Sequence, residues 1–129
     1  MKAVVVDDSK MLRTRIIDMI SDVPGIEIAG EAENSHEAMK IIETVIPEIV
    51  VLDIRMPDGN GIELLKSISQ KNLSLVKIVL SNYSISQFKD KCYELGADYF
   101  FDKSSEFEKV RELIVNIISE SKTCDEEKQ

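Results

Sequence analysis

The feature that most constrains this fold is an alternation of two hydrophobic periods along the chain. Short runs rich in β-branched residues alternate five times with longer segments whose apolar residues have helical spacing. Such runs suit strands of a parallel sheet, and the segments between them suit the helices that cover its faces. The strands are expected at residues 3–6, 26–29, 49–52, 77–80 and 99–101. The pattern predicts an α/β fold, a (βα)5 doubly wound parallel sheet.

Polar residues and one glycine mark where the helices should start and stop. Asn34 with Glu37, and Ser105 with Glu108, have the spacing of a capping box, in which each side chain satisfies a free backbone N–H group. Gly96 is expected to end a helix, because glycine tolerates the left-handed turn found at many helix ends.

A single domain is expected to account for almost the whole chain. Its 129 residues can form one hydrophobic core and are too few for two ordinary domains. The last helix carries a regular apolar stripe, consisting of Val110, Leu113, Ile114, Ile117 and Ile118. Beyond Ser119 the apolar residues become scarce, so we expect a domain over residues 1–121 and a polar, disordered tail over residues 122–129.

The charge of the chain excludes some partners. A net charge of -8, from 24 acidic and 16 basic residues, repels nucleic acid and anionic lipid, so neither is an expected partner. No apolar stretch approaches the length of a membrane span or a signal-peptide core, which favours a cytoplasmic location. Cys92 and Cys124 lack the spacing of metal ligands and are expected to be reduced and incidental.

Four of the five predicted strands end in polar residues that could share a site. These residues are Asp7, Asp8, Asp53, Ser81 and Lys103. In open parallel sheets, ligands bind beyond the carboxyl ends of the strands, where the strand order reverses. With the flavodoxin-like order 2-1-3-4-5, the first and third strands are neighbours, roughly 4.8 Å apart. Their three carboxylates would then crowd into one crevice.

The residue types at these strand ends favour metal-assisted phosphoryl chemistry. Crowded carboxylates repel one another unless a cation is bound, and a site of oxygen ligands suits magnesium or manganese. Lys103 and Ser81 supply an ammonium and a hydroxyl that can hold phosphoryl oxygens. Asp53 is then placed as a nucleophile that forms an acyl phosphate.

Each of these residues also has an ordinary structural explanation. Asp8 or Ser9 could cap the first helix, Ser81 could cap another, and Asp53 and Lys103 could be solvated loop residues. The segment Asp58-Gly59-Asn60-Gly61 is first of all a turn. These explanations are weaker for four strand ends together than for any one of them.

The strand-end residues, with the segments Met56-Pro57-Asp58-Gly59-Asn60-Gly61 and Gly96-Ala97-Asp98, closely resemble the receiver domain of two-component response regulators. The resemblance is to the stand-alone chemotaxis-regulator type and spans residues 2 to about 119. It implies a phosphoacceptor switch, in which a sensor histidine kinase or a phosphotransfer protein passes a phosphoryl group to Asp53. Such a protein catalyses only its own phosphorylation and dephosphorylation, so turnover of an external substrate is not expected.

The resemblance also implies a role for individual residues. Magnesium, with manganese as the alternative ion, would be held by Asp8, Asp53 and the backbone carbonyl of Arg55, and by Asp7 through water. Ser81 and Lys103 would contact the phosphoryl group, and Ser81 with Phe100 would form the conformational switch. The helices near residues 84–95 and 106–118, with the strand between them, would contact the downstream protein target.

Some positions depart from the usual receiver pattern. Ser104 follows Lys103 where many receivers have a proline in a cis bond, so we expect a trans bond and a rearranged start of the last helix. Asn82 replaces a small residue, and could narrow access to Asp53 or hydrogen-bond the phosphoryl group. Arg55 and Tyr83 flank the expected path of the attacking water and should tune the lifetime of the phosphorylated state, and Phe100 lacks the hydroxyl of a tyrosine.

Other functions remain possible on the sequence alone. The chain could be the receiver part of a DNA-binding response regulator, because lysine followed by serine also occurs in such proteins. A haloacid-dehalogenase-type phosphatase resembles Asp-x-Asp after the first strand, whereas Asp7 and Asp8 are adjacent. A flavodoxin-like cofactor binder would need phosphate-binding donors where these two acids stand. His36 is expected at the surface rather than as a ligand or phosphoryl carrier.

Overall fold

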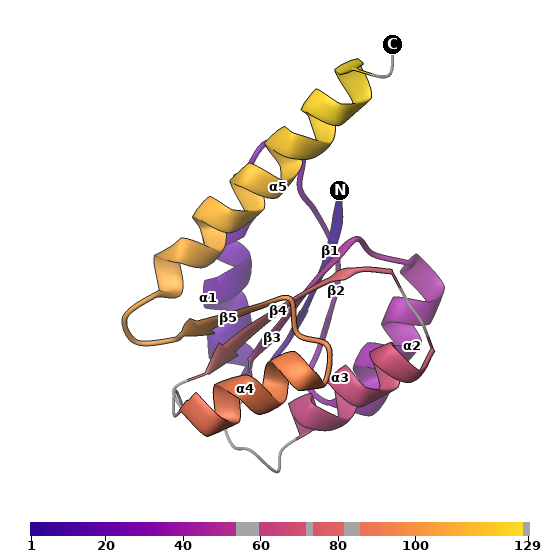
Figure 1. Ribbon diagram of the computed structural model, residues 1–129, viewed down its shortest axis with the longest axis vertical. Coiled ribbons are helices and arrows are strands. Elements are labelled where there is room, and N and C mark those ends of the chain that lie inside the picture. Colours follow the sequence, from indigo (N-terminus) through magenta and orange to yellow (C-terminus); the bar gives the residue numbers. More distant parts are fainter. Residues whose placement is uncertain (54–59, 72–73, 82–85, 128–129) are drawn as a thin grey trace.

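The computed structural model describes the backbone of residues 1–53, 60–71, 74–81 and 86–127 (Figure 1). Side chains are described for the same residues except 60–61, 86–88 and 121–127. Strands and helices alternate along the described residues. The elements in order are β1 (Lys2–Val6), α1 (Lys10–Ile20), β2 (Glu27–Ala32), α2 (Ser35–Val45), β3 (Ile49–Asp53), α3 (Asn60–Gln70), β4 (Val76–Ser81), α4 (Ser86–Glu94), β5 (Tyr99–Asp102) and α5 (Phe107–Glu127).

The five strands form one parallel sheet in the order β2-β1-β3-β4-β5, which confirms the predicted topology. All five predicted runs lie within or overlap an observed strand. The central strand β3 is buried along its first four residues, as its continuous apolar sequence predicts for a strand covered on both faces.

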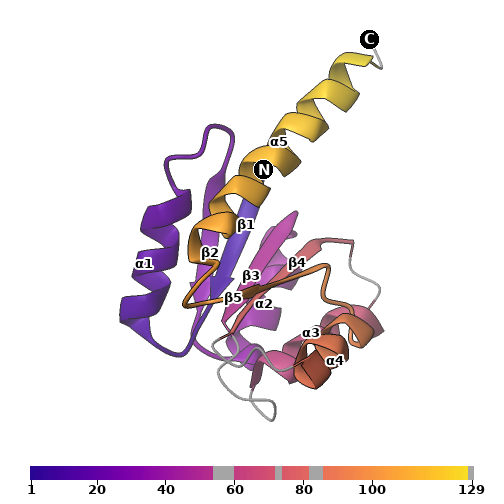
Figure 2. The same cartoon turned by 60° about the vertical axis from the view of Figure 1, so that its left-hand side comes forward.

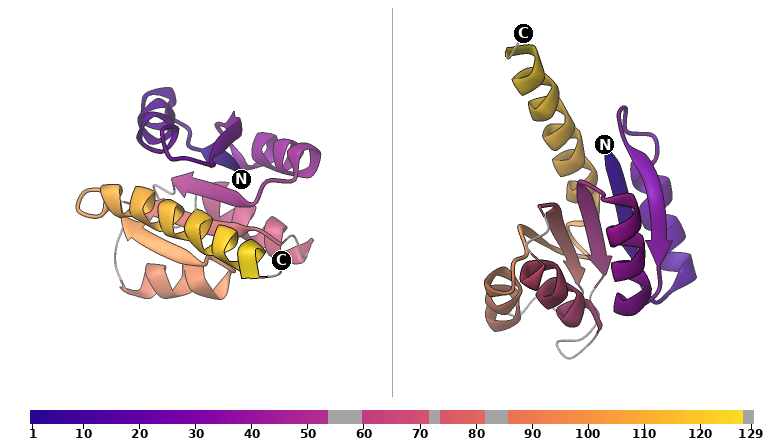
Figure 3. Two further views of the ribbon diagram at one scale, coloured as in Figure 1. Left: turned by 90° about the horizontal axis from the view of Figure 1, so that it is seen from above. Right: turned by 90° about the vertical axis from the view of Figure 1, so that its right-hand side faces the viewer.

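Two hydrophobic clusters fill the two faces of the sheet. Val4 and Val6 of β1 pack with residues of α2, α3 and α4, whereas Ala3 and Val5 pack with residues of α1 and α5. Figure 2 shows α1 and α5 on one side of the sheet, and the right-hand view of Figure 3 shows α2, α3 and α4 along the other. Successive residues of β1 point to opposite faces, so one short strand joins both halves of the core.

Helix α5 lies against the sheet through the predicted apolar stripe and then projects past the sheet (Figure 1). Val110, Ile114 and Ile118 are buried, and Leu113 and Ile117 are partly buried. Of the predicted polar tail, residues 122–127 form the last turns of this helix, and residues 128–129 lie outside the described residues. Its disorder stays a prediction. In the described part of the chain, no helix is long and apolar enough to cross a membrane.

The predicted start of α2 and end of α4 are confirmed. Asn34 is the N-cap of α2, and its side-chain oxygen accepts a hydrogen bond of 2.8 Å from the Glu37 N–H group. Helix α4 ends before Gly96, whose φ of 109° lies in the left-handed region. A Cβ atom at Gly96 would lie 2.4 Å from the Ser69 hydroxyl oxygen, so there is also no space for a side chain at this position.

The capping box predicted at Ser105 and Glu108 is wrong. Helix α5 starts at Phe107, so Ser105 lies before the helix and does not cap it. A turn organised by Asp102 replaces the box. The described residues contain no cis peptide bond, so the bond between Lys103 and Ser104 is trans as predicted.

Candidate functional site

The carboxyl ends of four strands bring the predicted site residues to one edge of the sheet. Asp7 directly follows β1, Asp53 is the last residue of β3, Ser81 ends β4 and Lys103 directly follows β5. The register aligns these ends, because residues 52 and 53 of β3 lie opposite residue 6 of β1 and residue 80 of β4, respectively. Because β1 is paired with both β2 and β3, the site lies where the strand order reverses.

Lys103 is the centre of this site. Its ammonium forms a hydrogen-bonded ion pair with Asp53 Oδ2 and lies 3.7 Å from Asp7 Oδ2. The side chain of Lys103 is 9% exposed, and those of Asp53 and Asp7 are 1% and 0% exposed. The pKa of Lys103 is lowered below its ordinary value because the side chain is buried. The neighbouring carboxylates of Asp7 and Asp8 act in the opposite direction and offset part of this shift. The ammonium therefore compensates two buried carboxylates.

Among the described residues, one oxygen of each buried carboxylate has no partner within hydrogen-bond distance. These atoms are Asp7 Oδ2 and Asp53 Oδ1. Asp7 Oδ1, in contrast, accepts a hydrogen bond of 3.0 Å from the Ser9 N–H group. A buried carboxylate oxygen without a donor is costly, so the two atoms are suited to receive a cation or a reacting group.

The donor chemistry fits a hard divalent cation such as magnesium. Asp7 and Asp53 each provide a buried carboxylate oxygen without a donor, and Asp8 lies next to Asp7 in an exposed position. The part of the chain that the structure describes contains no ready-made group of three or more His, Cys, Asp or Glu side chains able to hold a metal. The fold brings Asp7 and Asp53 together around Lys103. The role of Asp8 as a metal ligand stays a prediction.

Ser9 takes the ordinary role of capping helix α1, which leaves Asp8 without that explanation. Ser9 is the N-cap, and its hydroxyl oxygen accepts a hydrogen bond of 3.4 Å from the Leu12 N–H group. The two acids after β1 thus differ, with Asp7 buried in the site and Asp8 exposed at its margin.

Arg13 supports the acidic end of β1 and was not among the predicted site residues. Its Nη1 atom donates a hydrogen bond of 2.7 Å to the Asp7 carbonyl oxygen, and its Nε atom donates one of 3.0 Å to Glu31. The sequence carried a signal for this role, because Arg13 lies on the same helix face as the buried residues Ile16 and Ile20. An arginine on an apolar stripe is almost never buried unless it is paired.

Ser81 and Phe100 lie on the neighbouring strands β4 and β5. Ser81 is fully buried, and its carbonyl oxygen accepts a hydrogen bond of 2.9 Å from the Lys103 N–H group. Phe100 is buried in the core, with the Lys89 ammonium 5.9 Å from the centre of its ring. Arg55, Asn82 and Tyr83 lie outside the described residues, as do residues 56–59 of the predicted turn.

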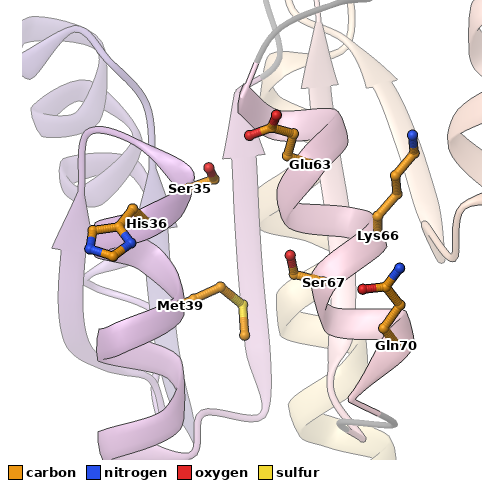
Figure 4. Close-up of a pocket in the computed structure, with 7 residues that line it drawn as sticks. All are labelled: Ser35, His36, Met39, Glu63, Lys66, Ser67 and Gln70. Carbon is orange, nitrogen blue, oxygen red and sulfur yellow. The ribbon is translucent and has the colours of Figure 1, made fainter.

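The solitary histidine lies at the edge of a separate groove. The groove lies between α2 and α3 and has a volume of about 450 Å³. Met39 and Ser67 face each other across it (Figure 4). His36 is exposed, as predicted for a surface residue. Lys103 and its two carboxylate partners do not line the groove.

The fold and the site define a class, the doubly wound α/β proteins with an acidic site at the carboxyl edge of the sheet. Comparison with protein-family models places the chain within this class. The model of the response regulator receiver domain matches residues 3–115, so the chain belongs to the response regulator receiver family.

Curated relatives and solved structures agree with this assignment. A protein-glutamate methylesterase/protein-glutamine glutaminase of Treponema denticola is 36% identical over 106 residues, which are 81% of this chain and 28% of that protein. The nitrate/nitrite response regulator protein NarL of Escherichia coli is 34% identical over 101 residues, 78% of this chain and 47% of that protein. The chain thus spans about a quarter to a half of the length of these two relatives.

Two solved structures are matched over a larger share of their own chains than these relatives are. A LuxR-family two-component response regulator from an Aurantimonas species superposes with a TM-score of 0.82 at 28% identity, covering 92% of this chain and 84% of that chain. The response regulator domain of Thermotoga maritima CheB gives a TM-score of 0.77 at 28% identity, covering 93% and 94%. This chain is thus similar both to a LuxR-family regulator and to the response regulator domain of CheB.

Proposed function

We propose that this receiver domain is a phosphoacceptor switch whose Asp53 accepts a phosphoryl group from a sensor histidine kinase or a phosphotransfer protein. The observation that carries the proposal is the buried Lys103, whose ammonium is shared by Asp53 and Asp7 while each carboxylate keeps one oxygen without a hydrogen-bond donor. This arrangement places a nucleophile, the Asp53 carboxylate, beside the Lys103 ammonium, which can stabilise the negative charge on the phosphoryl oxygens during transfer.

The proposed reaction moves one phosphoryl group. A carboxylate oxygen of Asp53 attacks the phosphorus atom, the P–N bond of a phosphohistidine breaks, and the imidazole leaves with the electron pair and takes up a proton. The product is a mixed anhydride on Asp53. Lys103 then turns its ammonium to a phosphoryl oxygen, and the Ser81 hydroxyl donates to another, so both groups stabilise charge that forms during transfer.

Magnesium is the proposed cofactor, with manganese as a substitute. Asp8, Asp53 and the backbone carbonyl of Arg55 would bind it directly, and Asp7 would bind it through water. When bound there, the ion would offset the negative charge on the phosphoryl oxygens and on the crowded carboxylates.

Phosphorylation would act on a conformational equilibrium. A phosphoryl group adds roughly 1.5 to 2 negative charges and three acceptor oxygens. Contacts from Ser81 to those oxygens would bias the packing of Phe100, and the surface of α4, β5 and α5 would change its affinity for a protein target. Asn82, Arg55 and Tyr83 are proposed to set access to Asp53 and the lifetime of the phosphorylated state.

A second candidate concerns the output rather than the chemistry. The relatives named above are longer than this chain and include a nitrate/nitrite response regulator and a methylesterase. A DNA-binding transcriptional activator of Mycobacterium tuberculosis, DevR/DosR, is also similar to this chain, which supports a role as the receiver part of a DNA-binding response regulator. A role as an aspartyl-phosphate phosphatase is less well supported, because Asp7 and Asp8 are adjacent.

Phosphoryl transfer is tested with acetyl phosphate and magnesium, followed by intact mass spectrometry. Wild type should gain one phosphoryl group, and Asp53→Asn should gain none. Asp98→Asn is the matched control, because Asp98 precedes β5 at the opposite edge of the sheet and accepts a hydrogen bond from the Lys77 N–H group. The proposal fails if wild type gains no mass or if the gain survives in Asp53→Asn.

Magnesium binding is tested by thermal unfolding. A ligand that binds only the folded state raises its stability, so the unfolding temperature of wild type should rise with magnesium concentration. Asp8→Ala should abolish that rise. An equal rise in the variant would remove Asp8 from the ligand set.

A further inference from the structure

We propose that Asp102 and Glu106 are positioning residues that hold the Lys103 ammonium in place for phosphoryl transfer. This inference rests on the proposed function and adds two residues to its machinery. Its basis is a closed network of hydrogen bonds in the segment that joins β5 to α5.

Asp102 organises the turn on the carboxyl side of Lys103. Its Oδ1 atom accepts hydrogen bonds from the Ser104 N–H group at 2.9 Å, the Ser105 N–H group at 3.2 Å and the Ser104 hydroxyl at 2.6 Å. A single carboxylate oxygen therefore fixes the next two peptide groups after Lys103. An aspartate that binds backbone N–H groups just ahead of it is a common way of closing a turn.

Glu106 closes the network from the other end. Its Oε1 atom accepts a hydrogen bond of 3.0 Å from the Asp102 N–H group, and its own N–H group donates one of 2.8 Å to the Asp102 carbonyl oxygen. The second carboxylate oxygen pairs with the Lys109 ammonium at 3.2 Å. The Asp102 N–H group, and to a lesser extent Lys109, hold the pKa of Glu106 below its ordinary value, so this acceptor is ionised at neutral pH.

Lys103 lies between these fixed peptide groups. Its own N–H group donates a hydrogen bond of 2.9 Å to the Ser81 carbonyl oxygen, at the end of the β4–β5 pairing. The backbone on both sides of Lys103 is thus tied, and only the side chain is left to reach Asp53 and Asp7. Ser104 and Ser105 are exposed, so burial of these two residues does not hold the turn in place.

Loss of the turn should therefore displace the ammonium and slow the reaction. Asp102→Ala removes the acceptor of all three bonds, and we expect the rate of phosphorylation by acetyl phosphate to fall about tenfold or more, since small displacements of a reacting group are costly. Asp102→Asn should restore most of the rate, because an amide oxygen can accept the same bonds at the position of Oδ1.

A double-mutant cycle separates positioning from a general loss of structure. If Asp102 acts through Lys103, then Asp102→Ala should slow wild type but should not slow Lys103→Ala any further. Asp98→Ala is the matched control, since Asp98 also accepts a backbone hydrogen bond next to β5, and it should leave the rate unchanged. Glu106→Ala repeats the cycle with a second variant, in case Asp102→Ala does not fold.

The outcomes distinguish this inference from the proposed function. Absence of any phosphoryl gain in wild type overturns both. Normal phosphorylation of Asp53 in wild type, with an unchanged rate in folded Asp102→Ala and Glu106→Ala, overturns only the positioning role. Equal slowing in the wild-type and Lys103→Ala backgrounds also overturns it, because the effect would then bypass Lys103.

Discussion

At the scale of single residues, the site depends on how charge is balanced away from water. Asp7 and Asp53 are both buried and carry like charges, and the Lys103 ammonium lies within ion-pair distance of each. Removing one partner from a buried set of charges leaves the others uncompensated, which is more costly than losing an exposed ion pair. Lys103 is thus a structural residue as well as a proposed participant in phosphoryl transfer.

Lys103→Met should lower the free energy of unfolding by about 3 kcal/mol without magnesium, because it leaves two buried carboxylates without their cation. Magnesium should stabilise this variant more than it stabilises wild type, since the ion no longer competes with an ammonium. Urea unfolding with and without magnesium measures both quantities. A variant as stable as wild type without magnesium would show that the ion pairs are not formed in solution.

Some site residues could be predicted from the sequence and others could not. Asp7, Asp53, Ser81 and Lys103 were predictable, because strand ends can be read from the apolar runs and parallel strands end at the same edge. The network around Asp102 was not, because its acceptor atom serves residues two and three positions ahead in a turn that only the structure defines.

At the scale of elements, two helix ends are set by left-handed residues, one a glycine and one not. Gly96 follows α4 with a φ of 109°, and Ile46 is the C-cap of α2 with a φ of 50°. Glycine adopts this conformation without strain, whereas a β-branched residue rarely does. The same geometry therefore predicts opposite effects of substitution at the two ends.

Gly96→Ala should lower the free energy of unfolding by about 1–2 kcal/mol, because alanine is strained in the left-handed region. The new Cβ atom would also lie 2.4 Å from the Ser69 hydroxyl oxygen. In a Ser69→Ala background the cost of the substitution should be smaller but still present. Chemical denaturation of the four proteins measures this, and a fully neutral Gly96→Ala would contradict the assigned φ.

Ile46→Gly should raise the free energy of unfolding by about 1 kcal/mol, because the left-handed strain is relieved. Ile46 is 74% exposed, so little buried surface is lost. Met11→Gly is the matched control, since Met11 is 80% exposed but lies inside α1, where glycine should destabilise. Thermal unfolding distinguishes the two, and destabilisation by both would refute the strain at Ile46.

The elements themselves could be predicted better than their ends. The periods of the apolar residues predicted every strand and helix, because burial dictates those periods. The start of α5 was predicted wrongly, since the Asp102 turn occupies the residues that the capping-box pattern assigned to the helix. The positive φ of Ile46 has no signal in the sequence, because the residue before a proline is ordinarily extended.

At the scale of the whole molecule, strand order decides where the net charge of -8 matters. Pairing of β1 with β3 brings Asp7 and Asp53 to the same edge, although the two residues are far apart in the sequence. Most acidic residues lie on the exposed surface, whereas these two are buried beside one ammonium. The fold thus gathers part of a general negative charge into one localised acidic site, which is the site proposed to bind a cation and a phosphoryl group.

The central claim is that the phosphoryl group is carried by Asp53, and the most direct measurement locates it. The protein is incubated with magnesium and phosphoramidate, whose P–N bond stands in for that of phosphohistidine, and is then reduced with borohydride, which converts an aspartyl phosphate to homoserine. Peptide mass spectrometry should find homoserine at position 53 and nowhere else, and only when magnesium and the phosphodonor are both present. Reduction at another aspartate, or none at position 53 in folded protein, would contradict the account.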